Sequence, residues 1–117
     1  VPRRFGFFGN EGATTMNIIV YTTCPDPETA RAISRKVVEQ RLAACVHSHP
    51  AGTSVFEWEG RIEEDAEILL MIKTKEKLYQ PLEAAILAAH PYDVPEIIAV
   101  SIDQGLAPYL RWIDHLD

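Results

Sequence analysis

The sequence predicts an α+β domain of the ferredoxin-like type, a split β-α-β-β-α-β fold, with an additional C-terminal helix. Two observations lead to this prediction. Extended and helical segments follow one another in that order along the chain, and a short glycine-containing turn joins the two central extended segments into a long hairpin. A chain of 117 residues, 47% of them hydrophobic, suits one domain with a real core.

The first strand and the first helix have clear local signals. Residues 17–23 are mainly β-branched or aromatic, which predicts a strand. Asp26-Pro27 combines a good N-cap with a proline at the first helical position, so a helix begins there. Its apolar residues recur at helical spacing to about Leu42. From 44 to 57 the pattern is again extended, with an interruption at Pro50-Ala51-Gly52.

The second half of the chain repeats this order. Gly60, in the turn between the central strands, is expected to have a positive φ. The remaining elements are a strand from 62 to 74, a helix from near Lys77 to Pro91, a strand from Glu96 to Ile102, and a helix from Leu106 to Leu116.

The two central strands are unusually long for a domain of this size. Each has about a dozen residues, against a usual length of about five or six. At about 3.3 Å per residue they reach roughly 40 Å, whereas the expected radius of gyration is about 13 Å. The projecting part would expose unpaired strand edges, which soluble proteins avoid. We therefore predict an obligate homo-oligomer, in which identical chains cover these edges.

Composition narrows the possible partners and compartment. The formal net charge is −6, from 17 acidic and 11 basic residues. No basic surplus remains to bind nucleic acid or an anionic membrane, and no apolar run is long enough to insert into a bilayer. Two cysteines do not make a disulfide framework, so we expect a reducing cytoplasm.

Neither the N-terminal segment nor a search for catalytic motifs indicates a function. Residues 1–15 precede Met16 and show neither periodicity nor the apolar core of a signal peptide. We interpret them as a tag remnant or a disordered extension, and 16–117 as the single domain. No nucleophile–base pair and no glycine-rich phosphate loop is recognisable, so we do not expect an enzyme.

One candidate metal site follows from the expected strand order. The last strand of a ferredoxin-like sheet lies antiparallel to the first, which brings Cys24 near the loop that contains His90. A thiolate and an imidazole at this place suit copper or zinc. The simpler interpretation of His90 is a helix-terminal histidine that interacts with backbone carbonyls.

A weaker alternative metal cluster lies at the start of the second strand. Cys45, His47 and His49 alternate, so in an unbroken strand all three side chains project from one face and suit copper or zinc. Cys45 is equally well explained as a small buried hydrophobic residue. Pro50 can also twist the strand enough to separate the two histidines.

A third candidate is acidic. The hairpin contains four carboxylates that could bind a hard cation through oxygen, namely Glu63, Glu64, Asp65 and Glu67. Successive residues of a strand point to opposite faces, so the four do not form one set. A solvated hairpin is the simpler explanation for them.

Five sequence blocks span nearly all of the chain from 17 to 116. They are Cys24-Pro25-Asp26, Arg41 to Val46, Trp58-Glu59-Gly60, Ile72-Lys73-Thr74, and His90-Pro91-Tyr92 with Val94 to Ile97. In order and spacing they resemble the CutA family, the divalent-cation tolerance proteins. The resemblance implies a very stable cytoplasmic homotrimer linked to tolerance of copper and other divalent cations. It also implies binding of Cu(II) or a similar ion.

The resemblance bears on the site residues too. In some relatives the metal ligands are a cysteine on the first strand and a His-His pair before Pro-Tyr. Here Thr22 holds the earlier cysteine position and Ala89 the first histidine position, whereas His90 matches.

The family blocks also predict a pocket between subunits. Its residues would be Trp58, Lys73, Tyr92 and Glu96, a mixture typical of ligand sites, although an ordinary interface has a similar composition. The alternative function is therefore a small-molecule-sensing or partner-binding signalling trimer without a specific metal. Only the analogy of fold with nitrogen-regulatory signalling trimers favours it.

Overall fold

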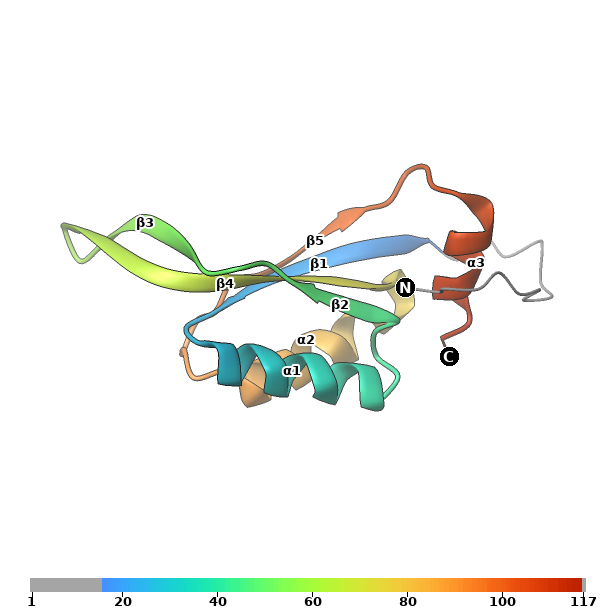
Figure 1. The fold of residues 1–117 in the computed structure, drawn as a ribbon, viewed down its shortest axis with the longest axis horizontal. Coiled ribbons are helices and arrows are strands. Elements are labelled where there is room, and N and C mark those ends of the chain that lie inside the picture. The colour runs from blue at the N-terminus through green and yellow to red at the C-terminus, as the bar shows by residue number, and fades with distance from the viewer. Residues whose placement is uncertain (1–15, 117) are drawn as a thin grey trace.

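The computed structural model describes residues 16–116, in which one antiparallel sheet has two helices packed on the same face (Figure 1). The interpretation of residues 1–15 as a tag or extension lies outside the described residues. The elements are β1 (Asn17–Cys24), α1 (Pro27–Glu39), β2 (Cys45–Ser48), β3 (Gly52–Trp58), β4 (Arg61–Lys75), the 3-10 helix η1 (Glu76–Leu78), α2 (Tyr79–Ala89), β5 (Ile97–Ser101) and α3 (Ala107–Asp114).

The strand order confirms the predicted ferredoxin-like fold. The main path through the sheet is β2-β4-β1-β5, and β3 pairs with the first half of β4. β1 is central and antiparallel to both of its neighbours, with Thr22 opposite Leu70 on one side and Ile97 on the other. Alternate residues of β1 and β4 are buried under α1 and α2, as the period-two pattern requires.

Helix α1 begins where the sequence predicts and ends earlier. The Asp26 carboxylate accepts a hydrogen bond of 2.7 Å from the Thr29 amide, which caps the first turn. The helix was predicted to reach about Leu42, but it ends at Glu39. Arg41 takes a positive φ of 60°, and the Leu42 amide donates back to the Val37 carbonyl at 2.9 Å. This is a Schellman ending, with arginine in the position that glycine usually occupies.

The extended segment predicted from 44 to 57 is interrupted at Pro50, as expected, and the interruption divides it into two strands. β2 ends at Ser48 and β3 begins at Gly52. Pro50 lies between them and has no backbone N–H to contribute to a ladder. Beyond this break the β3–β4 hairpin closes as predicted, with positive φ at both Glu59 and Gly60, as in a two-residue type I′ turn.

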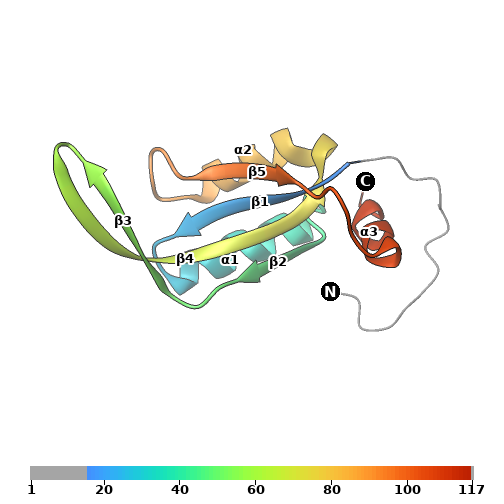
Figure 2. The same ribbon diagram turned by 90° about the horizontal axis from the view of Figure 1, so that it is seen from above.

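The hairpin extends well past the rest of the sheet. In Figures 1 and 2 it projects from the end opposite α3, and neither α1 nor α2 lies under its tip. The molecule accordingly measures 52 × 24 × 23 Å, with a radius of gyration of 15.5 Å, above the value of about 13 Å expected for this length. Large apolar side chains are exposed on it, among them Trp58 and Ile62.

Helix α3 is held to the other end of β4 by a buried lysine. The Lys75 ammonium donates to the carbonyls of Asp114 and Leu116 at 3.0 and 2.6 Å. These are carbonyls at the C-terminal end of a helix, where a cation is favoured. Lys75 is only 3% exposed, so these bonds replace its water shell.

Candidate functional site

A cavity with carboxylate walls lies between the projecting hairpin and the loop that follows α2. Its volume is about 640 Å³. We call it the acidic groove, and its lining residues are Phe56, Trp58, Glu63, Asp65, Glu67, Tyr92, Asp93 and Val94. Four of these eight side chains are carboxylates, and none is basic, so the groove suits a positively charged ligand.

Strand alternation and hairpin register explain why these side chains meet. Glu63, Asp65 and Glu67 are two residues apart along β4, so they share a face. Phe56 lies directly opposite Glu63 in the antiparallel ladder. Of the four carboxylates considered from the sequence, three therefore line the groove, and Glu64 points to the other face. The sequence-based candidates did not include Phe56 and Asp93, because the first depends on register and the second on the path of a loop.

Tyr92 and Glu67 are joined at the inner end of the groove. The Tyr92 hydroxyl donates to one carboxylate oxygen of Glu67 at 3.0 Å, and the Ser54 hydroxyl donates to the other at 2.6 Å. Burial, followed by this bond to Glu67, raises the pKa of Tyr92 to about 12. At neutral pH Tyr92 is therefore a phenol that donates its proton, and both oxygens of Glu67 are occupied.

His90 anchors the loop that carries Tyr92. The Tyr92 backbone amide donates to His90 Nδ1 at 3.1 Å, so Nδ1 has no proton and Nε2 carries it. Nε2 in turn lies 2.7 Å from the Thr23 carbonyl, to which it donates. The ring is 8% exposed. The structure thus brings His90 to the end of β1, as expected, but both nitrogens have partners. A metal ligand role for His90 stays a prediction, and it requires displacement of one of these bonds.

Cys24 lies one residue beyond the carbonyl that His90 contacts. Its side chain is fully buried in the core beneath the sheet. Burial, with smaller contributions from Asp26 and Glu67, raises the pKa of its thiol to about 11. Metal binding requires the thiolate, so at neutral pH a metal would have to overcome both protonation and burial. Cys24 as a ligand likewise stays a prediction.

The alternative cluster on β2 is brought together only in part. The rings of His47 and His49 are in edge contact, with centroids 5.1 Å apart. The Cys45 sulfur instead lies 4.0 Å from the Tyr109 hydroxyl on α3. Within residues 16–116, no three His, Cys, Asp or Glu side chains are close enough together to hold a metal ion.

The four residues expected to form a pocket between subunits do not meet within one protomer. Trp58 and Tyr92 both line the acidic groove. Lys73 is six residues beyond Glu67 on β4, roughly 20 Å away, and its ammonium lies 5.9 Å from the centre of the Tyr109 ring. Glu96 is exposed just before β5. A pocket that contains all four requires a second subunit and stays a prediction.

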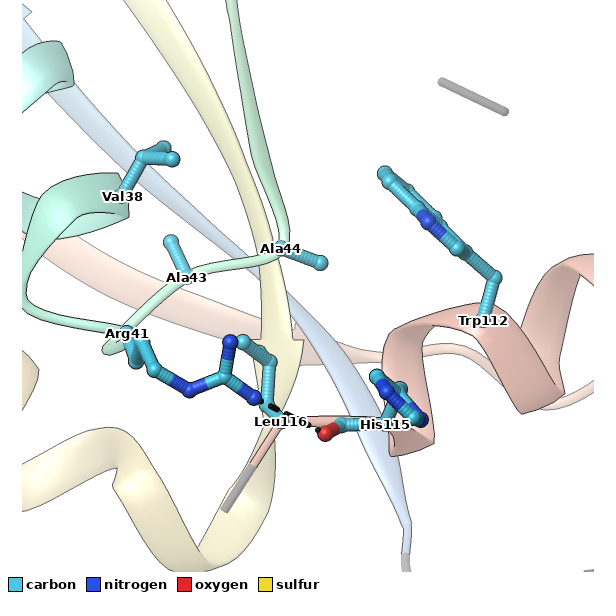
Figure 3. Close-up of a pocket in the computed structure, with 7 residues that line it drawn as sticks. All are labelled: Val38, Arg41, Ala43, Ala44, Trp112, His115 and Leu116. Carbon is cyan, nitrogen blue, oxygen red and sulfur yellow. Dashed lines mark hydrogen bonds between the residues drawn. The ribbon is translucent and has the colours of Figure 1, made fainter. Parts of the chain in front are cut away.

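A smaller cavity of about 150 Å³ lies where the end of α1 meets α3. Figure 3 shows Arg41 reaching across it to the backbone carbonyl of His115, a hydrogen bond of 3.1 Å, with Trp112 on the far wall. The residue with positive φ that ends α1 therefore also ties the C-terminal helix to the domain. We assign this cavity a structural role.

The fold and the groove define a class of protein: a ferredoxin-like subunit with a central hairpin that extends past its sheet and presents carboxylates. A family profile described as the CutA1 divalent ion tolerance protein matches residues 18–115. The chain belongs to the CutA1 family. The family is named for tolerance of divalent ions and not for a reaction.

Relatives and solved structures agree with this assignment. The chain is 44% identical over 98 residues to the divalent-cation tolerance protein CutA of Thermus thermophilus, covering 84% of this chain and 95% of that protein. The crystal structure of CutA from Xylella fastidiosa superimposes with a TM-score of 0.84 at 42% identity, covering 86% of this chain and 98% of that one. Protein CutA of Homo sapiens is 50% identical over 93 residues, covering 80% of this chain and 52% of that protein. The chain thus spans about half the length of the mammalian relatives it matches.

The names of the relatives give more than one compartment. The protein of Arabidopsis thaliana is described as chloroplastic, and that of Archaeoglobus fulgidus as periplasmic. None of the helices between residues 16 and 116 is long and apolar enough to cross a membrane.

Proposed function

We propose that this protein supports tolerance of divalent cations by binding them, copper(II) included, as a cytoplasmic homotrimer and without catalysing a reaction. The observation that carries the proposal is the acidic groove, in which four carboxylates and no basic side chain surround a cavity of about 640 Å³. Carboxylate oxygens are the ligands that hard divalent ions take from proteins, and Cu(II) accepts oxygen ligands together with nitrogen.

Not all four carboxylates are equally available to an ion. Glu67 is held by Ser54 and Tyr92, so it contributes negative charge more than free oxygen ligands. Glu63, Asp65 and Asp93 remain, and Asp65 and Asp93 are exposed. They do not form a closed coordination set within one protomer. We therefore propose that rotation of these side chains, with waters or a neighbouring subunit, completes the coordination.

Two features support the trimer. The hairpin exposes Trp58 and Ile62, which are 61% and 72% exposed, and the sheet face opposite the helices exposes Ile98 and Val100. Apolar surface of this kind is usually covered by a partner. A closed ring of identical chains covers the hairpin of every copy in the same way.

The state of the two cysteines bears on the proposed compartment. Both are free thiols, as suits a reducing cytoplasm.

The alternative is a small-molecule-sensing or partner-binding trimer without a specific metal. The aromatic lining of the groove is compatible with an organic ligand. The family description and the name of the Thermus thermophilus relative refer to divalent ions and favour cation binding.

The experiment is a calorimetric titration of the protein with Cu(II) in a buffer that does not chelate it. We expect the double variant Glu63→Gln with Asp65→Asn to weaken binding at least tenfold, because it removes two groove carboxylates. Glu64→Gln is the matched control, since Glu64 lies on the same strand and faces away from the groove. Equal loss in both variants would mean that only overall charge matters. No loss in either would place the ion elsewhere.

The same titration tests whether His90 is a ligand. If His90 is a ligand, His90→Ala weakens the binding of Cu(II). The variant Glu63→Gln with Asp65→Asn, which keeps His90, then retains part of its affinity for Cu(II). If His90 only positions the Tyr92 loop, the substitution lowers stability and leaves the affinity for Cu(II) nearly unchanged.

The oligomeric state has a separate test. Sedimentation velocity at micromolar concentration should give a mass near three chains for the native sequence. Ile62→Glu places a charge on the exposed hairpin, and we expect it to shift this mass toward the monomer. A monomeric native protein would contradict the trimer.

A further inference from the structure

A second group of side chains able to bind a metal lies at the edge of the sheet, beyond the acidic groove along β4. It combines His47 of β2 and His49, which follows the end of β2, with Met71 of β4. The two imidazole rings are in edge contact at 5.1 Å between centroids. His49 Nε2 lies 2.9 Å from the Met71 sulfur.

The register of the sheet explains why these three side chains meet. Met71 is directly opposite His47 in the β2–β4 ladder. The His49 amide donates to the Leu69 carbonyl at 2.9 Å, which places His49 diagonally from Met71. Diagonal neighbours on one face are within reach of long side chains. His47 and Met71 therefore share the sheet face opposite α1 and α2, and His49 reaches Met71 from just beyond the end of this edge strand; His47 is exposed in the protomer.

We propose that His47, His49 and Met71 bind a soft monovalent metal ion, Cu(I), through two imidazole nitrogens and one thioether sulfur. Thioether sulfur is a poor ligand for hard or borderline divalent ions and selects Cu(I). Imidazole also suits copper, and three ligands are enough for an ion that takes low coordination numbers. The chemistry differs from that of the carboxylates in the acidic groove. The site is thus separate from the acidic groove and does not depend on cation binding there.

The present arrangement needs only a small adjustment to admit an ion. At bond lengths of about 2.0 Å to nitrogen and about 2.3 Å to sulfur, a trigonal ion would hold these two atoms about 3.7 Å apart. The present distance between His49 Nε2 and the Met71 sulfur is 2.9 Å. Methionine has three rotatable bonds and adapts its sulfur position readily. An opening of less than 1 Å therefore requires no movement of the backbone.

Cys45 could also supply a sulfur ligand in place of Met71, because thiolates bind Cu(I) strongly. It is two residues before His47 on the same strand, and its sulfur is directed toward Tyr109. The experiment must therefore separate the thioether of Met71 from the thiol of Cys45.

The test is an anaerobic competition for Cu(I) between the protein and a chromophoric Cu(I) chelator, with ascorbate as reductant. We expect Met71→Leu to weaken Cu(I) binding at least tenfold. This swap nearly conserves volume, so the fold should survive. His49→Ala should cause a similar loss, and Cys45→Ser should cause none. The carboxylate variant Glu63→Gln with Asp65→Asn should bind Cu(I) like the native protein.

X-ray absorption of the Cu(I)-loaded protein provides an independent readout. A sulfur ligand should remain in Cys45→Ser and disappear in Met71→Leu. The opposite result, with binding and the sulfur signal lost in Cys45→Ser and kept in Met71→Leu, would overturn the proposal. So would equal affinities of Met71→Leu and the native protein.

Discussion

The two halves of β4 obey the same strand alternation and have opposite environments. In the second half, from 68 to 75, every even residue is buried beneath α1 and α2. In the first half, from 61 to 67, the apolar residue Ile62 is 72% exposed, and the odd residues are mostly acidic. The first half is paired with β3 on one side only, whereas the second half is paired with β1 and, from 70 to 73, also with β2. The second half therefore has strand partners on both sides and helices over one face, and the first half has neither.

This difference suggests two separate tasks for one strand. The covered half supplies the core, and its side chains stabilise the protomer through the removal of apolar surface from water. The projecting half contributes little to that core. Its exposed apolar residues and its row of carboxylates are available to other molecules, which in our proposal are neighbouring subunits and cations. Substitutions in the covered half should accordingly lower the stability of the protomer, whereas substitutions in the projecting half should change subunit contacts or cation binding.

The largest expected effect is in the covered half. Ile72 is fully buried, so Ile72→Ala removes packed methylenes and leaves a cavity. We expect a loss of about 2–5 kcal/mol in the free energy of unfolding, measured by urea denaturation at several protein concentrations. Ile62→Ala is the matched control on the same strand. It should change the free energy of unfolding of the protomer by less than about 0.5 kcal/mol. Similar losses for both would contradict the distinction between the halves.

A smaller effect is expected where β4 ends at α3. Lys75→Met keeps an apolar stem but leaves the carbonyls of Asp114 and Leu116 without their buried donor. We expect a loss of about 1–3 kcal/mol, together with a change in the fluorescence of Trp112 as the helix loosens. Unchanged stability and fluorescence would show that these bonds do not hold α3.

The contact between the projecting half of β4 and the loop after α2 can be tested through the titration of Tyr92, whose hydroxyl donates to Glu67. Its pKa is raised to about 12 from an ordinary value of 10. A tyrosine whose pKa is higher when folded stabilises the fold fully below pH 10, and this contribution is lost as the pH rises through 12. Glu67→Gln should lower the pKa of Tyr92 toward 10, measured by ultraviolet titration of tyrosinate. Because Tyr109 also has a pKa of about 12, Tyr92→Phe identifies the step. An identical titration in Glu67→Gln would contradict the assignment.

The smallest effect concerns a thiol. Cys24 is fully buried, and its pKa is raised to about 11, so it should not react with a thiol reagent at pH 8 in the folded protein. Mass spectrometry of the labelled peptides should find Cys24 modified only after denaturation. Modification under native conditions would show that the end of β1 opens readily.

Much of the fold was predictable because its signals are local. The N-cap at Asp26, the turn at Gly60 and the alternation of β4 each depend on a few neighbouring residues, and all three were confirmed. The break at Pro50 was likewise expected and is confirmed. The error at Leu42 has a different origin, because the end of α1 depends on a positive φ at Arg41, which the residue type does not indicate.

The candidate sites show the same division more sharply. By itself the sequence determined the order of the elements, the family blocks, and which residue types could bind a metal, since these follow from spacing and chemistry. Only the tertiary structure decided which of them meet. Strand register placed Met71 beside His49 and turned Cys45 toward α3, and loop packing used both nitrogens of His90. Register and packing bring together residues that are far apart in the chain, so these contacts cannot be predicted from a local sequence pattern.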